Sequence, residues 1–138
     1  MICVSLTWGC ATASPIAPET SLSAATLTQA LRDAGATVSV AETEPQDSFP
    51  FFSVRSRRTV VNGEDVHVFE YPNSEKAVSD QAKVSKTGTP VGTTQITWVA
   101  PPRFYEKGRI IVLYVGRSDD VSRRLETVLG QPFAGAGS

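Results

Sequence analysis

The chain has 138 residues, of which 41% are hydrophobic and 20% charged, as is ordinary for a soluble globular domain. Its 13 lysines and arginines nearly balance its 14 aspartates and glutamates. The net charge of −1 therefore provides no basic stripe of the kind that binds nucleic acid. A chain of this length is expected to form one domain around one hydrophobic core.

The composition divides the chain into three parts. Residues 1–21 are a signal-like segment followed by a linker of small residues and prolines, and residues 134–138 are a flexible Gly/Ala tail. Residues 22–133 are predicted to fold as a single α+β domain. Both cysteines, Cys3 and Cys10, lie in the first part. We therefore expect neither a disulfide nor a cysteine-based metal site inside the domain.

Residues 1–11 are apolar, but they are too few to span a bilayer, which takes roughly 20 apolar residues. The run ends in Gly9-Cys10 and resembles the end of a bacterial lipoprotein signal, where a small residue precedes the lipidated cysteine. By this resemblance Cys10 would carry the lipid, and the protein would touch a membrane only through that anchor. The alternative is an irregular tail on a cytoplasmic protein.

The first predicted element is a helix that begins at Ser21 or Ser23 and ends near Ala34. Its apolar residues recur at i, i+3, i+4 and i+7 from Leu27, and Gly35 supplies a stop. A short alternating strand over residues 37–41 follows. A polar loop over residues 42–50 then leads to a second strand that begins at Phe51.

The strongest local signal is Asn62-Gly63, which lies between β-branched runs and predicts a hairpin with a type I′ turn. The second strand is expected to reach residue 61 and the return strand to run through residues 66–71. Asn73 or Ser74 can then cap a helix that ends near Ser85.

In the second half, polar and apolar residues alternate over residues 93–99 and predict a strand that ends before Pro101-Pro102. A turn or a ragged strand end is expected at residues 104–108. The run 109–116 is the most apolar and predicts a buried central strand. A last helix is expected over residues 118–129, closed by Gly130. Shifting one half by 44 residues superposes two strand-strand-helix units. The pattern predicts an antiparallel sheet of about five strands with three helices, mostly on one face.

The sequence carries no motif for a catalytic, cofactor or metal site. His67 is the only histidine, and it should point away from the face that carries Val66 and Val68. The carboxylates of Glu64, Asp65 and Glu70 flank the hairpin, where such groups are normally solvated. We therefore expect a protein that is not an enzyme.

Aromatic residues gather around Pro101-Pro102. Trp98, Phe104 and Tyr105 lie there with Arg103, a composition typical of a recognition surface. We predict that these four residues form a binding site. The alternative is that Trp98 and Phe104 close the two ends of the core. Three further arginines (Arg55, Arg57 and Arg58) could extend a binding face, although charges on a strand usually keep a sheet edge soluble.

The run Val-Asn-Gly-Glu-Asp-Val-His-Val-Phe-Glu-Tyr resembles uncharacterised bacterial envelope lipoproteins. Two later runs, Thr-Trp-Val-Ala-x-Pro-x-Phe-Tyr and Gly-Arg-Ile-Ile-Val-Leu-Tyr-Val-Gly, share this resemblance. It covers about residues 27–133 and implies an exported domain in the cell envelope, without an activity or a site.

The expected function is a lipid-anchored binding module for a protein or small ligand. The alternatives are a secreted or periplasmic inhibitor that uses the bend at Arg103-Phe104-Tyr105, and an enzyme of unrecognised type.

Overall fold

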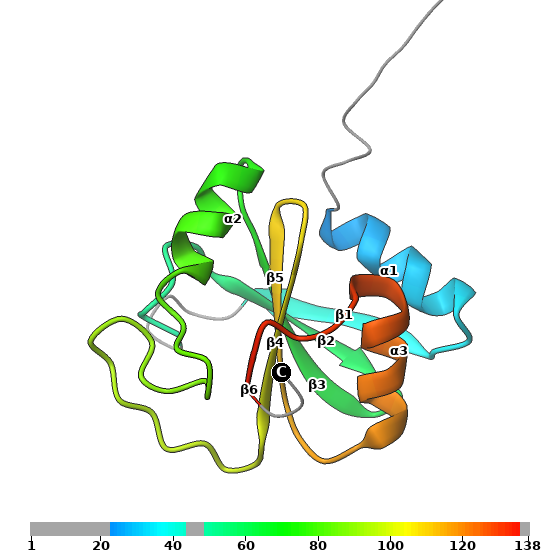
Figure 1. Cartoon of the computed structure of the whole chain (residues 1–138). Helices are drawn as coiled ribbons and strands as arrows, with labels where there is room; N and C mark the ends of the chain where they lie inside the picture. The colour runs from blue at the N-terminus through cyan, green and yellow to red at the C-terminus, as the bar shows by residue number, and fades with distance from the viewer. Residues whose placement is uncertain (1–22, 44–48, 136–138) are drawn as a thin grey trace, which may run out of the picture.

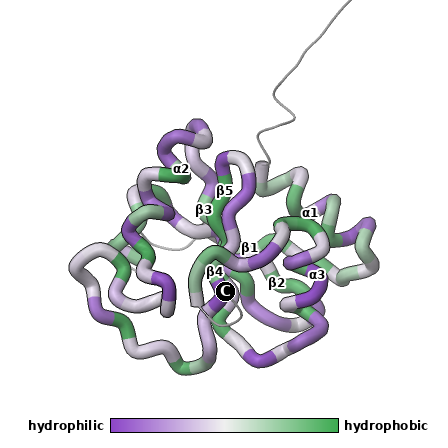
Figure 2. Tube along the Cα trace, viewed as in Figure 1, coloured by the Kyte–Doolittle hydropathy of each residue, from purple (hydrophilic) through white to green (hydrophobic). Residues whose placement is uncertain are grey.

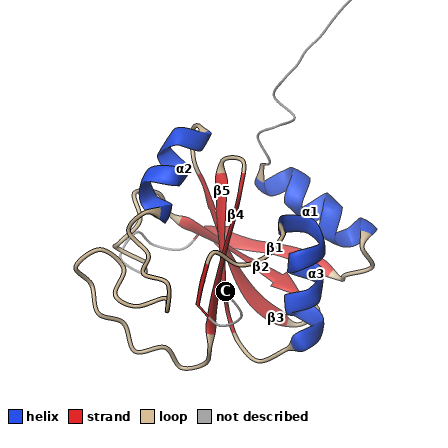
Figure 3. Cartoon of the chain, viewed as in Figure 1, coloured by secondary structure: helices blue, strands red, loops and turns tan. Residues whose placement is uncertain are grey.

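A computed structural model of the chain describes residues 23–43 and 49–135. These residues form an α+β arrangement in which helices separate groups of consecutive strands (Figure 3). Their order is α1 (Ala24–Asp33), β1 (Val38–Thr43), β2 (Ser56–Val61), β3 (Glu64–Glu70), α2 (Ser74–Gln81), β4 (Pro102–Lys107), β5 (Ile110–Val115), α3 (Asp119–Leu129) and β6 (Ala134–Gly135).

The described strands form one antiparallel sheet in the order β1-β2-β3-β5-β4-β6. The centre of the sheet is the pair β3–β5, where Val68 lies opposite Val112. Within the described residues the sheet thus has six strands rather than about five. The sixth strand corrects the prediction of a flexible tail over residues 134–138, because Ala134 is buried and pairs with Phe104. Residues 136–138 of that predicted tail lie outside the described part.

Helices cover both faces of the sheet. Helices α1 and α3 pack on one face, and α2 lies on the other together with the segment between α2 and β4 (Figure 1). Hydrophobic stretches concentrate where the strands cross the middle of the molecule (Figure 2). The central position of β5 explains its sequence, because side chains from both of its faces enter the core.

The predicted helix starts are confirmed by their caps. Ser23, Asn73 and Ser118 each accept a hydrogen bond from the backbone N–H three residues later, at 3.2, 2.9 and 3.2 Å. At the other end of α1, Gly35 has a φ of +93°. This left-handed conformation favours glycine and ends the helix where the sequence predicted.

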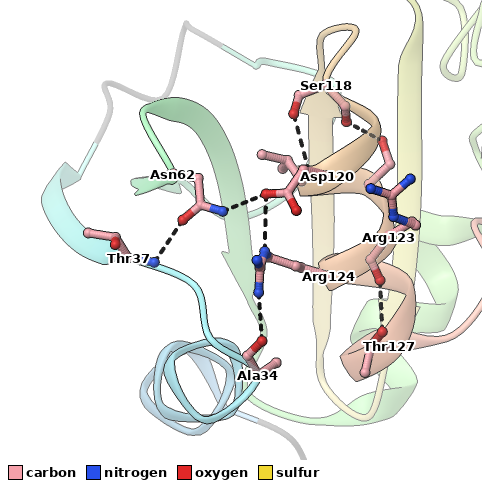
Figure 4. A network of polar contacts seen from close by, with 10 residues as sticks. Ala34, Thr37, Asn62, Ser118, Asp120, Arg123, Arg124 and Thr127 are labelled. Atoms are coloured by element: carbon pink, nitrogen blue, oxygen red, sulfur yellow. Dashed lines mark hydrogen bonds and ion pairs between the residues drawn. The ribbon is translucent and has the colours of Figure 1, made fainter.

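The hairpin between β2 and β3 is confirmed, with φ values of 49° at Asn62 and 83° at Gly63. The side chain of Asn62 also joins distant parts of the fold (Figure 4). Its Oδ1 accepts a hydrogen bond from the Thr37 N–H (2.8 Å), and its Nδ2 donates to Asp120 (2.7 Å). Arg124 continues the network, donating to Asp120 and to the carbonyl of Ala34. The turn residue therefore ties the hairpin to α3 and to the start of β1.

Two predicted strand boundaries and one predicted helix end are wrong. The segment 51–55 forms turns, and β2 begins only at Ser56. Pro102 opens β4 instead of stopping a strand, and residues 104–107 are part of that strand rather than a turn. Proline is tolerated there because it is the first residue of the strand. Helix α2 ends at Gln81 rather than near Ser85.

Residues 93–99 form no ladder of the sheet, although their alternation is real. Ile96 and Trp98 are half-buried against the core, whereas their neighbours Gln95, Thr97 and Val99 are exposed. The Ile96 N–H donates to the hydroxyl of Thr89 (3.0 Å) instead of to a neighbouring strand. An extended segment that lies across a sheet face produces the same period of two as a strand within the sheet.

The predicted order of strand, strand and helix does occur twice, as β2-β3-α2 and as β4-β5-α3. The two helices nevertheless pack on opposite faces of the sheet. Among the described residues, three helices accompany the sheet, α1 and α3 on one face and α2 on the other.

Candidate functional site

An apolar pocket of about 420 Å³ lies on the α2 face of the sheet, where β3 and β5 pass beyond the helix. Its floor is His67 from β3 and Val115 from β5. One wall is the segment 49–51 and the other is the segment 94–99. The lining residues are Phe49, Pro50, Phe51, His67, Thr94, Ile96, Thr97, Trp98, Val99 and Val115.

The first wall is held by aromatic stacking. The ring of Phe49 lies 4.7 Å from the imidazole of His67 and 5.5 Å from the ring of Phe69, measured between centroids. Phe51 packs edge-to-face on Phe52, which is buried against Phe69. His67 points away from the Val66 and Val68 face, which confirms the predicted orientation and places the imidazole at the pocket.

The second wall is held by Trp98. Its Nε1 donates to the carbonyl of Gly88 (3.0 Å), and its ring packs edge-to-face on Phe104 at 5.8 Å. Next to it, Val99 is 89% exposed at the rim of the pocket. A large apolar side chain left in water beside an apolar hollow is a feature of interaction sites.

The carboxylate of Asp80 anchors the first wall to α2. Its Oδ2 accepts hydrogen bonds from the N–H and hydroxyl of Ser53 (2.7 and 2.8 Å) and from the Tyr71 hydroxyl (2.9 Å). Its Oδ1 lies 2.8 Å from Nζ of Lys83. Asp80 and Tyr71 are both buried, so this network fixes the segment 49–53 against the helix and the end of β3.

The network shifts the pKa of two groups. Burial alone would raise the pKa of the Asp80 carboxyl, but the hydrogen bonds from Lys83, Ser53 and Tyr71 outweigh it and hold the pKa below its usual range. For Tyr71, burial first and the Asp80 charge second raise the pKa of the phenol far above its usual value. Asp80 is therefore ionised and Tyr71 neutral at neutral pH.

A second buried tyrosine has no such partner. Tyr105 lies under α3, and neither its hydroxyl nor Nη1 of Arg103 has a hydrogen-bond partner among the described residues. Ser122 is near that hydroxyl and donates to the carbonyl of Ser118 (3.0 Å), but it forms no hydrogen bond with the Tyr105 hydroxyl. The pKa of Tyr105 is raised to about 12, first by burial and second by the nearby charge of Glu126. This phenol is neutral and carries no exposed surface.

The four residues predicted to form a binding surface do not lie together. Phe104 and Tyr105 are both 0% exposed, and they point to opposite faces of the sheet because they are neighbours on β4. Arg103 shares the α3 side with Tyr105. The prediction of an exposed patch at this bend is therefore wrong, and the inhibitor surface loses its basis with it. Of these four residues, only Trp98 lines the pocket. The predicted lipid site, Cys10, and the signal-like segment 1–21 lie outside the described residues.

Sequence reasoning missed the first wall of the pocket. The signal is the run Phe49-Pro50-Phe51-Phe52, which the sequence prediction divides between a polar loop that ends at Pro50 and a strand that begins at Phe51. A lone histidine in a sequence is more often a packed or surface residue than a base or ligand, and the structure places His67 among the apolar residues that line the pocket. The carboxylates near the hairpin are separated from each other. Glu64 accepts a hydrogen bond from Tyr114, while Asp65 and Glu70 pair with Arg58 and Arg109.

Within residues 23–43 and 49–135, no three His, Cys, Asp or Glu side chains are close enough together to hold a metal ion. None of the helices in those ranges has the length and apolar character needed to cross a membrane.

Comparison of the chain with protein-family models, with curated proteins and with solved structures finds no match.

Proposed function

We propose that this protein is a small binding module that takes an apolar group of its ligand into the pocket between Phe49 and Trp98. The observation that supports it is the hollow itself, which is lined by aromatic and aliphatic side chains and rimmed by the exposed Val99. Both walls are pre-organised, one by the Asp80 network and the other by the Trp98 hydrogen bond. A preformed apolar pocket binds without the cost of ordering its walls.

A charge placed at the rim tests the pocket. We expect Val99→Lys to weaken binding of N-acetyl-phenylalaninamide about tenfold, because an apolar ligand would have to desolvate the ammonium group. The measurement is a ¹⁵N–¹H NMR titration of the full chain with that probe, in which the largest shifts should fall on the amides of Phe49, Phe51, His67 and residues 94–99. Stability should change by less than about 0.5 kcal/mol, since the substituted side chain is exposed.

Val78→Lys is the matched control, because Val78 is also an exposed valine but lies on α2 outside the pocket. This variant should bind like the wild type. Equal weakening by both substitutions, or shifts spread over other surfaces, would exclude the pocket as the binding site.

We further propose that the module is exported and lipid-anchored at Cys10. This part rests on the Gly9-Cys10 ending of the apolar segment and on the resemblance to envelope lipoproteins. In a bacterial host fed an alkyne-tagged fatty acid, the full chain should incorporate the label and Cys10→Ser should not. Absence of label from the wild-type chain would contradict the anchor, and Cys3→Ser controls for nonspecific acylation of a thiol.

A further inference from the structure

A second groove lies on the opposite face of the sheet from the apolar pocket, between α1 and strands β1 to β3. It consists of two adjoining hollows of about 320 and 170 Å³, and Ala24, Arg57 and Glu70 line both of them. Because α1 and the pocket lie on different faces, a ligand in this groove would not compete with a ligand in the pocket.

The α1 side of the groove is built from one helix face. Ala24, Thr28 and Arg32 follow each other at intervals of four residues and all line the larger hollow. Ala24 and Thr28 have small side chains, so they leave the hollow open. At a rise of 1.5 Å per residue this wall is about 12 Å long, which matches about four residues of an extended peptide.

The sheet side of the groove carries the charge. Arg55 and Arg57 are two residues apart and both line the smaller hollow, while Thr59 continues the same face into the larger one. Beside them, Val40 of the edge strand β1 is 46% exposed and also lines the groove. The surface therefore combines guanidinium groups with an apolar contact.

The positive charge of the groove is not neutralised by described residues. Neither Arg55 nor Arg57 forms an ion pair or a side-chain hydrogen bond with any residue in the ranges 23–43 and 49–135. Glu70 is the one carboxylate among the described lining residues, and it is already engaged. It accepts from Nη2 of Arg109 (3.1 Å) and from the Ala24 N–H (3.3 Å). Arg32 adds a further cation at the other end, where Nη2 donates to the Val38 carbonyl (3.0 Å).

We propose that this groove binds an extended acidic peptide segment of a partner protein, with acidic and apolar residues in alternation. Arg57 lies in β2 and Arg55 just before the strand, and both line the smaller hollow. An extended peptide repeats its side chains on one face about every 6.6 Å, so two successive carboxylates on that face can reach the two guanidinium groups. Carboxylates of the peptide would pair with Arg55 and Arg57, since guanidinium groups bind carboxylates through two parallel hydrogen bonds. Val40 would contact an apolar side chain of the peptide. The groove is concave, and so it suits a chain better than a flat anionic membrane.

Fluorescence anisotropy with the full chain and a fluorescein-labelled (Glu-Val)₄ peptide tests this proposal. We expect binding that weakens as NaCl rises from about 50 to 300 mM, because salt screens exposed ion pairs. The double variant Arg55→Gln/Arg57→Gln should bind the peptide about tenfold more weakly, from the loss of two charge pairs. The (Lys-Val)₄ peptide should not bind.

Arg58→Gln is the matched control, because Arg58 directly follows Arg57 in β2 but pairs with Asp65 on the other sheet face. It should leave the peptide affinity unchanged. Val99→Lys should also leave it unchanged, which separates the groove from the pocket and from the function proposed for it.

Three results would overturn the proposal: no binding of (Glu-Val)₄ to the wild type, equal loss in Arg58→Gln, or arginine-dependent capture of phosphatidylserine vesicles without peptide binding.

Discussion

Phe104→Ala is expected to lower the free energy of unfolding by about 4 kcal/mol, the largest effect of any single change considered for this protein. The ring is fully buried and contacts three other aromatic rings, those of Phe52, Trp98 and Phe133, at centroid distances of 6.4, 5.8 and 6.0 Å. Alanine would leave a cavity that the rigid sheet below cannot fill. Urea denaturation followed by far-ultraviolet circular dichroism measures the change. A loss below about 1 kcal/mol would contradict the core position of this residue.

The neighbouring residue provides the contrast. Tyr105→Phe keeps the buried ring but removes a hydroxyl that has no hydrogen-bond partner in the described chain. An unpaired polar group in the core costs about 1–3 kcal/mol, so this variant should be as stable as the wild type or more stable. A marked destabilisation in the same urea experiment would mean that the hydroxyl is satisfied in solution.

Asp80→Ala is expected to lower the free energy of unfolding by about 3 kcal/mol, because it leaves the buried Tyr71 hydroxyl and the Ser53 N–H without their acceptor. The loss should be accompanied by faster amide hydrogen exchange in residues 49–54, since Ser53 is the link from the pocket wall to α2. Asp33→Ala removes an exposed carboxylate at the end of α1 and should change stability by less than about 0.5 kcal/mol. Unchanged exchange in residues 49–54 would show that the wall is held by aromatic packing alone.

The same carboxylate makes stability depend on acid pH. Hydrogen bonds hold the folded-state pKa of Asp80 below the ordinary value of 3.8, despite its burial. The unfolded chain therefore binds this proton more readily, and the stabilisation is complete above pH about 4 and is lost as the pH falls through the folded-state pKa. Asp80→Asn removes this titration. The stability difference between wild type and Asp80→Asn should thus shrink below pH about 4, and a constant difference from pH 6 to pH 3 would contradict the assignment.

Local signals predicted the elements that depend on neighbours in the chain. The Asn62-Gly63 turn, the caps at Ser23, Asn73 and Ser118, and the buried strand around residues 110–115 all occur where the sequence placed them. Each depends on the φ angle of one residue, on a hydrogen bond across three residues, or on a continuous apolar run. These effects act over a few residues, so a single sequence is enough to reveal them.

Predictions were wrong where one local sequence pattern is compatible with two different tertiary structures. Residues 93–99 alternate because they lie across the sheet face, and Pro102 begins a strand because its first position needs no N–H donor. The binding site at the bend failed for the same reason. Trp98, Phe104 and Tyr105 lie within eight residues of one another in the sequence. Phe104 and Tyr105 nevertheless point to opposite faces of the sheet, because they are neighbours on one strand.

Local chain interactions therefore decide the turns, the helix starts and the central strand of this protein. The two hollows follow from long-range packing instead. The pocket needs Phe49, His67 and Trp98 from three separate segments, and the groove needs α1 to lie beside Arg57. Which face a helix covers depends on contacts between residues tens of positions apart, and no short stretch of the chain carries that information.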